Sequence, residues 1–167
     1  KLDVSKRPGG YRLKRLTATE FAQEINRLLD LYAWEVTLVQ LNLLSSHDMP
    51  RFVSLVGGDK DALKLATLFQ MTFPGAPCVY YGDEVGMRGG SDPGSRGGFP
   101  WDEGDWDKDL LTFFRRAIAL RRNHPALRRG QYAGLLADDD QGLYAFARKG
   151  EPETLVVVLN NGTSSYE

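Results

Sequence analysis

Two short apolar runs alternate with two helical patterns in the first half of the chain, and this order restricts the fold more than any other feature. An amphipathic pattern over residues 17–32 precedes an apolar run over 36–44, and a second pattern over 60–72 precedes a run over 76–81. The first run is continuously apolar, which favours a strand buried on both faces. Alternating helices and strands are typical of a parallel sheet covered by helices. Two strands cannot form such a sheet alone, so we expect most of the sheet to be missing from this chain or to be supplied by another one.

Short capping and turn signals mark the ends of these elements. Thr17 and Glu20 form the T-x-x-E pattern of a capping box, and Asp59 can cap the helix over 60–72. Pro74-Gly75 predicts the end of that helix. The polar residues 1–12 are typical of a loop or linker.

The second half of the chain changes in composition twice. Residues 87–107 are rich in Gly, Asp and Pro, yet their aromatic residues argue against disorder. A third helical pattern over 108–123 leads to three strand-like segments, QYAGLLA, GLYAFAR and TLVVVLN. We therefore expect a domain boundary near residues 125–130 and an antiparallel sheet after it.

The composition excludes several classes of partner. The net charge of −1 gives no electrostatic footprint for nucleic acid or an anionic membrane, and no apolar stretch reaches membrane-spanning length. The N-terminal residues lack the apolar core of a signal peptide. The single cysteine, Cys78, cannot pair within the chain, which fits a reducing, cytoplasmic compartment. Six arginines fall between residues 115 and 129, and a solvated helix face is favoured over a binding patch.

The stretch SSHDMPR directly follows the apolar run over 36–44. It places His47 and Asp48 at the carboxyl end of an expected strand, and Asp83-Glu84 follows the next strand in the same way. Chemistry collects at the carboxyl ends of strands in parallel α/β proteins. A His-Asp pair is nevertheless common, so a capping or loop role is the default interpretation from this position alone.

Four longer segments carry a more specific signal. LNLLSSHDMPR, GAPCVYYGDEVGM, SDPGSRGGFPWD and LRRNHPALRRG follow one another in this order. Together they resemble the α-amylase family of glycoside hydrolases, and within it the neopullulanase, cyclomaltodextrinase and maltogenic amylase group. The resemblance implies an α/β fold that is the C-terminal part of a (β/α)8 TIM barrel, with strands seven and eight over 36–44 and 76–81 and a flanking helix over 17–32. Residues 1–127 would belong to that barrel, and residues 128–167 would begin an antiparallel all-β C-terminal domain, which is incomplete here.

The resemblance also implies roles for individual residues. Asp48 would stabilise the oxocarbenium-like transition state of a retaining glycosidase, because a fixed carboxylate offsets the developing positive charge. His47 would hydrogen-bond hydroxyl groups of the sugar at the cleavage point. Asp92 and Arg96 lie in a D-P-x-x-R pattern and would bind a glucose unit on the non-reducing side. An internal ion pair that holds this loop is an equally weighted alternative.

Neighbouring residues receive structural interpretations. Arg51 is expected to pair with carboxylates or to close its loop rather than to act in catalysis. Asp83 and Glu84 match a segment that is mostly structural in the family. Trp101 and Trp106 could stack on sugars, although packing in the core is favoured.

The nucleophile and the acid/base expected of this family do not occur in the sequence. Both would lie upstream, so we expect a fragment that is inactive by itself on maltooligosaccharides, cyclodextrins or related α-glucans. No cofactor or metal site is evident, although calcium occurs in many full-length relatives. Homo-oligomers, or association through exposed barrel strands, are compatible with an open barrel.

Two alternatives remain open at this stage. The chain could be a non-catalytic α-glucan-binding module or a half-barrel that a partner completes. Amylase-like subunits of amino-acid transporters need a membrane anchor and have generally lost the catalytic residues, whereas the His47-Asp48 pair favours an enzyme. These residues do not distinguish hydrolysis from transglycosylation.

Overall fold

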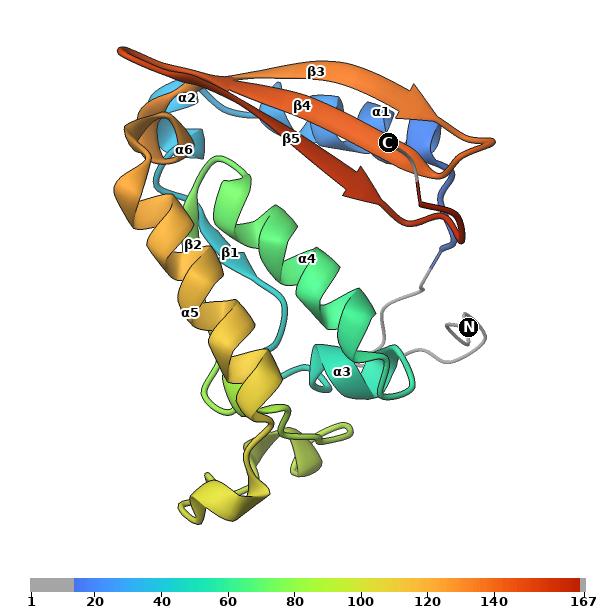
Figure 1. The fold of residues 1–167 in the computed structure, drawn as a ribbon, viewed down its shortest axis with the longest axis vertical. Helices are drawn as coiled ribbons and strands as arrows, with labels where there is room; N and C mark the ends of the chain where they lie inside the picture. The colour runs from blue at the N-terminus through green and yellow to red at the C-terminus, as the bar shows by residue number, and fades with distance from the viewer. Residues whose placement is uncertain (1–13, 166–167) are drawn as a thin grey trace. The chain divides into compact units, whose positions relative to one another are not determined.

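The computed structural model describes residues 14–165, so the polar segment 1–12, expected to form a loop, lies outside the described residues. Within the described range, no helix has the length and apolar character needed to cross a membrane. Three short 3-10 helices lie in the segment between residues 79 and 107: η2 (Asp83–Val85), η3 (Gly94–Arg96) and η4 (Glu103–Asp105). The other elements follow in this order (Figure 1): α1 (Ala18–Leu29), α2 (Trp34–Thr37), β1 (Leu41–Leu43), α3 (Phe52–Leu55), α4 (Lys60–Thr72), β2 (Ala76–Cys78), α5 (Lys108–Asn123), α6 (Pro125–Arg129), β3 (Gln131–Asp138), β4 (Leu143–Lys149) and β5 (Thr154–Asn160).

Contacts divide the chain into two compact units. The first contains Asn42–Gln70 and Pro77–Ala119, and the second contains Leu16–Leu41, Met71–Ala76 and residues 120–165. Each unit therefore combines segments that are distant in sequence. All candidate site residues named from the sequence belong to the first unit.

The core of the first unit lies between α4 and α5, which run side by side in Figure 1. Leu63 from α4 is buried against Leu110 and Phe114 from α5, together with Val53 from α3. Asp59 caps α4, since its carboxylate accepts two backbone N–H bonds of 3.0 Å from the first turn. The helices predicted over 60–72 and 108–123, and this cap, are therefore confirmed.

The strand predicted over 36–44 is wrong in its first half. Trp34–Thr37 forms the helical turn α2, closed by two backbone hydrogen bonds of 3.0 Å, and only Leu41–Leu43 is a strand. Burial on both faces is also wrong, because the two leucines of β1 are 61% and 50% exposed. β1 pairs with β2 in a two-stranded sheet, and β2 ends at Cys78, three residues short of the predicted run over 76–81.

The second unit contains an antiparallel sheet in the order β3-β4-β5, with α1 along one of its faces (Figure 1). Tyr144 and Phe146 of β4 point to the same face, because side chains alternate along a strand. Phe21 of α1 meets the ring of Tyr144 edge-on, with the centroids 5.2 Å apart. The antiparallel sheet predicted after residues 125–130 is thus confirmed.

The start of α1 is fixed by two sets of side-chain bonds. Thr17 and Glu20 form the predicted capping box, with bonds of 3.2 and 3.0 Å between each side chain and the other's backbone N–H. The backbone N–H of Thr19 donates to Asp139 at 2.7 Å, which joins α1 to the turn between β3 and β4. The N-terminal end of α1 is therefore also bonded to a residue that lies 120 positions further along the chain.

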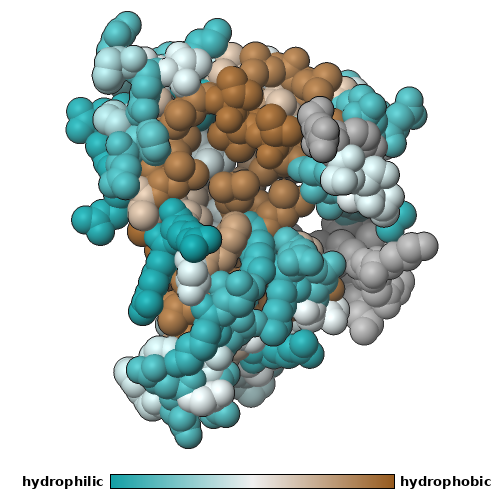
Figure 2. All heavy atoms as spheres, viewed as in Figure 1, coloured by the Kyte–Doolittle hydropathy of each residue, from teal (hydrophilic) through white to brown (hydrophobic). Residues whose placement is uncertain are grey.

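On the other face of the sheet, Ala145 and Ala147 of the central strand β4 are buried, whereas the valines beside them are exposed. Val156 and Val158 of β5 are 61% and 56% exposed, and Figure 2 shows hydrophobic residues gathered over this sheet.

Two arginines of the second unit donate hydrogen bonds to backbone carbonyls. Arg148 is fully buried and donates to the carbonyls of Thr72 at 2.6 Å and Gly130 at 2.8 Å. Burial lowers the pKa of Arg148 to about 10. Arg121 donates to three carbonyls at the end of and after α4, those of Met71, Phe73 and Gly75, at 2.5–3.0 Å, and so fixes the chain where the helix ends. The predicted solvated face is therefore wrong for Arg121.

Candidate functional site

A hydrogen bond joins the two ends of the loop that carries the His47-Asp48 pair in the first unit. β1 ends at Leu43, and α3 begins at Phe52. The buried hydroxyl of Ser45 accepts the backbone N–H of Phe52 at 3.0 Å, which joins the two ends of the loop. The backbone N–H of Asp48 donates to Ser46 Oγ at 3.2 Å within the loop. Because its ends are joined, the loop projects its middle residues outward.

His47 and Asp48 lie side by side on the surface. His47 Nε2 is 3.2 Å from Asp48 Oδ2, and the two side chains are 63% and 70% exposed. Both groups therefore keep donors and acceptors that a ligand can reach. The structure brings the predicted pair together at the expected place, after β1.

The D-P-x-x-R loop reaches the same place. Arg96 Nε is 2.9 Å from Asp92 Oδ1 and donates to the carbonyl of His47 at 3.2 Å. Arg96 Nη2 is 3.8 Å from Asp48 Oδ1. Arg96 thus contacts the other three predicted site residues. The internal ion pair weighed from the sequence is present, and both partners stay about half exposed.

Arg51 has the structural role expected of it. Its side chain is fully buried, with Nη1 donating to Asp83 Oδ1 at 3.1 Å and to the carbonyl of Tyr81 at 2.7 Å. The guanidinium carbon lies 4.7 and 4.9 Å from the ring centroids of Tyr80 and Tyr81. Burial raises the pKa of Asp83, while the Ser45 hydroxyl and Arg51 oppose that rise. This pair fastens the loop after β1 to the loop after β2.

The backbone of the two loops also meets directly. The carbonyl of Gly89 accepts a hydrogen bond of 3.0 Å from the backbone N–H of Arg51. The backbone N–H of Gly89 donates to Ser54 Oγ, also at 3.0 Å. A Cβ at Gly89 would collide with the carbonyl oxygen of Gly94. Only glycine therefore fits at position 89, where the two loops meet, and sequence reasoning missed this requirement.

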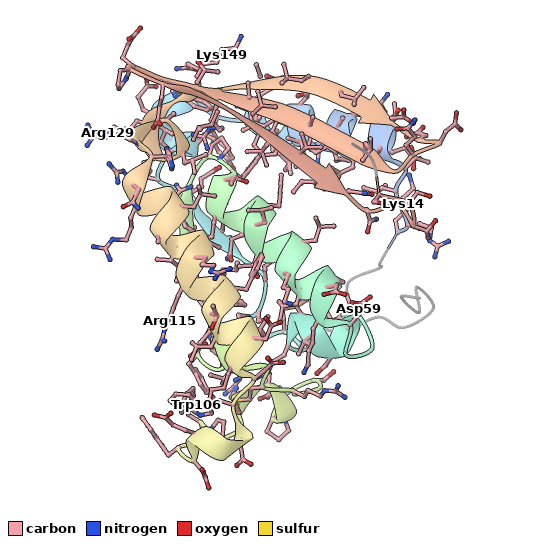
Figure 3. All side chains as sticks on the ribbon, viewed as in Figure 1. Lys14, Asp59, Trp106, Arg115, Arg129 and Lys149 are labelled. Atoms are coloured by element: carbon pink, nitrogen blue, oxygen red, sulfur yellow. The ribbon has the colours of Figure 1, made fainter. Side chains whose placement is uncertain are left out.

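Trp101 does not pack in the core of the described structure. Its side chain is 83% exposed and meets Phe99 with ring centroids 5.0 Å apart. Trp106, labelled in Figure 3, is half-buried and donates its indole N–H to the carbonyl of Pro100 at 2.6 Å. Core packing, favoured from the sequence for both tryptophans, is thus wrong for Trp101.

Sequence reasoning missed Ser95. It is fully buried, and its hydroxyl donates to the carbonyl of His47 at 2.9 Å. The only sequence signal was its position between Asp92 and Arg96, and a serine in a Gly-rich loop is ordinarily solvated. Among residues 14–165, no group of three or more His, Cys, Asp or Glu side chains could hold a metal ion.

An exposed imidazole, two carboxylates and a guanidinium thus gather on loops after two paired strands and present hydrogen-bond donors and acceptors to a ligand. The chain belongs to the α-amylase family: residues 2–109 match the model of the alpha amylase catalytic domain. It is 41% identical over 152 residues to a cyclomaltodextrinase of Geobacillus thermopakistaniensis and 40% identical over 144 residues to neopullulanase 2 of Thermoactinomyces vulgaris. These alignments cover 91% and 86% of this chain.

A solved structure gives the same result for the fold. The debranching enzyme of Nostoc punctiforme in its native form is 47% identical and superposes with a TM-score of 0.87 over 92% of this chain. The solved structures of this kind are TIM-barrel enzymes of the α-amylase family, and the chain covers 31% of that one. It spans about a quarter of the length of the curated relatives, 26% and 25% of the two above. The chain therefore corresponds to part of such a barrel.

Proposed function

We propose that this chain is part of a retaining glycosidase that hydrolyses α-glucosidic bonds in maltooligosaccharides, cyclodextrins or related α-glucans. One observation carries the proposal: Arg96 contacts His47, Asp48 and Asp92, so the four predicted site residues form one exposed cluster. Relatives named cyclomaltodextrinase and neopullulanase support this substrate class.

Asp48 and His47 take the central roles in this proposal. Asp48 stabilises the oxocarbenium-like transition state, because an anionic carboxylate near the anomeric carbon gains attraction as positive charge develops. His47, 3.2 Å from Asp48, donates to a hydroxyl group of the same sugar and orients it. Both side chains are more than half exposed, which leaves them accessible to a ligand.

Asp92 and Arg96 bind the next part of the substrate. Each is about half exposed, so their mutual ion pair leaves lone pairs and N–H groups for hydroxyls. A planar guanidinium and a carboxylate can each take two neighbouring hydroxyls of a glucose unit on the non-reducing side.

The nucleophile and the acid/base belong, in this proposal, to barrel strands outside this chain, so the chain alone is inactive. The exposed leucines of β1 support this, because the packed interior and the surrounding helices of a complete barrel cover both faces of each strand. We assign residues 1–127 to the barrel and 128–167 to the start of an all-β domain. The unpaired Cys78 suits a cytoplasmic location.

The test compares two purified polypeptides from the same gene: this chain, and the longest product of the reading frame that contains it. Both are incubated with maltoheptaose and β-cyclodextrin, and NMR records the anomer released. We expect cleavage with an α-anomeric product from the long polypeptide and none from the chain. Robust cleavage by the chain contradicts its inactivity, and a long polypeptide that cleaves no α-glucan refutes the function.

Substitutions then test the role of Asp48. We expect Asp48→Asn in the long polypeptide to lower kcat by about 10²–10³-fold, as loss of one preorganised electrostatic group does. The matched control is Asp61→Asn on α4, whose side chain is 95% exposed and lies outside the cluster. Equal activity of the two variants would exclude a catalytic role for Asp48.

A further inference from the structure

Ser95 is an unusual residue for its surroundings. Residues 91–94 and Arg96 are exposed, yet Ser95 between them is fully buried in η3. Its hydroxyl donates to the carbonyl of His47 at 2.9 Å, across 48 positions of sequence. A buried hydroxyl with one directed partner holds that partner in place, because breaking the bond leaves a buried polar group unsatisfied.

Two donors converge on the His47 carbonyl. Besides Ser95 Oγ at 2.9 Å, Arg96 Nε donates to the same oxygen at 3.2 Å. The loop that supplies both donors is itself anchored, since the Tyr81 hydroxyl donates to the carbonyl of Gly97 at 2.8 Å. The two donors that hold the His47 carbonyl therefore lie in a loop that is itself fixed by a hydrogen bond.

This carbonyl belongs to the peptide group that links His47 to Asp48. The peptide is planar, so its oxygen and the Asp48 N–H move together. The oxygen is held by Ser95 and Arg96, and the N–H donates to Ser46 Oγ at 3.2 Å on the opposite side. Both ends of the peptide are thus tied, which fixes the Cα position from which the Asp48 carboxylate extends.

We propose that Ser95 is a positioning residue: by holding the His47 carbonyl, it sets the Asp48 carboxylate in place and couples that carboxylate to the loop of Asp92 and Arg96. The inference rests on the proposed function and deepens it. A carboxylate that acts mainly in the transition state must be placed closely, because misplacement by about 1 Å can lower a rate about 10²-fold. Ground-state binding of neutral sugar is less sensitive to that placement.

The experiment uses the long polypeptide with Ser95→Ala, and with Ser91→Ala as the matched control. Ser91 lies in the same loop and is exposed. We expect Ser95→Ala to lower kcat about tenfold or more while KM changes less than about threefold, and Ser91→Ala to leave both unchanged. Thermal unfolding of each variant shows whether the fold is kept. Ser95→Thr, which retains the hydroxyl, is expected to recover part of kcat.

A second readout separates positioning from a general structural role. The dissociation constant of a cationic iminosugar, which imitates the charge of the transition state, is measured in four proteins: wild type, Ser95→Ala, Asp48→Asn and the double variant. We expect Ser95→Ala to weaken binding about tenfold in the wild-type background and not at all beside Asp48→Asn. Equal weakening in both backgrounds, a change in KM alone, or parity with Ser91→Ala overturns the inference. A wild-type long polypeptide that cleaves no α-glucan overturns the proposed function itself.

Discussion

Replacing the buried Arg51 by methionine is the sharpest test of how the two site loops are held together. The guanidinium is fully buried, pairs with Asp83 at 3.1 Å, donates to the Tyr81 carbonyl at 2.7 Å and lies over the rings of Tyr80 and Tyr81. Methionine keeps most of the buried volume and removes the charge and every donor. The carboxylate of Asp83, 5% exposed, is then left without its cation.

The expected loss of stability follows from these contacts. Removing one partner of a buried ion pair costs about 3–5 kcal/mol, mainly because the other charge stays buried and uncompensated. With a urea slope of about 1–3 kcal/mol per molar, the unfolding midpoint falls by at least about 1 M. Arg51→Met combined with Asp83→Asn removes both charges, so we expect the double variant to be more stable than Arg51→Met alone.

The loss should also depend on pH, and the sign follows from the pKa of Asp83. Burial raises this pKa above 3.8, so the carboxyl favours folding below 3.8 and loses that advantage as pH rises through the folded-state pKa. Arg51 opposes the rise, so its removal moves the pKa still higher and widens the pH range over which stability is lost. The deficit of Arg51→Met is therefore smallest near pH 3 and grows as the pH rises toward neutrality.

Urea unfolding followed by tryptophan fluorescence, at several pH values, measures both effects. The matched control is Arg115→Met on α5, which removes an exposed arginine that projects from the helix in Figure 3. We expect its effect to stay within about 0.5 kcal/mol at every pH. An Arg51→Met deficit below about 1 kcal/mol, or one that does not change with pH, would refute this account of the buried pair.

Three further changes probe other parts of the chain. Asp107→Ala removes the hydrogen bond of 2.9 Å that the Asp107 carboxylate accepts from the Leu110 N–H, and this bond is the main cause of the lowered pKa of Asp107. We expect thermal unfolding to show a loss of about 1–2 kcal/mol in stability that fades as the pH falls through the folded-state pKa, and a loss that persists in acid contradicts this expectation. The His124 hydrogen bond lowers the pKa of Glu153, so Glu153→Gln should flatten the fall of stability below about pH 4.5, and an unchanged acid limb contradicts this. Arg148→Met removes the hydrogen bonds that the carbonyls of Thr72 and Gly130 accept from the buried guanidinium and should cost about 2–4 kcal/mol in urea unfolding, whereas a neutral result removes its structural role.

The helices were predictable where local signals and periodicity agreed. α4 and α5 have the predicted bounds because Asp59 marks the start of α4, and both helices carry apolar residues at helical spacing. The run over 36–44 misled because apolar content does not distinguish a short strand from a helical turn. There the backbone closes a turn at Trp34–Thr37, and β1 keeps only three residues.

The candidate site was predictable as a set of residues but not as a geometry. Strand-end position and family resemblance together indicated His47, Asp48, Asp92 and Arg96, and the structure gathers them. That Arg96 contacts the other three depends on the path of a Gly-rich loop, which no periodic pattern encodes. Burial of Ser95 depends on the same path.

The bond from Thr19 to Asp139 has a consequence for the order in which this protein can fold as it is made. The ribosome releases α1 early, but the turn that receives its N-terminal N–H lies 120 residues later. At about 5–20 residues per second, that delay is on the order of ten seconds. Until then Phe21 has no Tyr144 to pack against, whereas Asn42–Gln70 and Pro77–Ala119 are already complete. The first unit of a nascent chain should therefore fold before the second. In the interval, the apolar face of α1 stays accessible to chaperones.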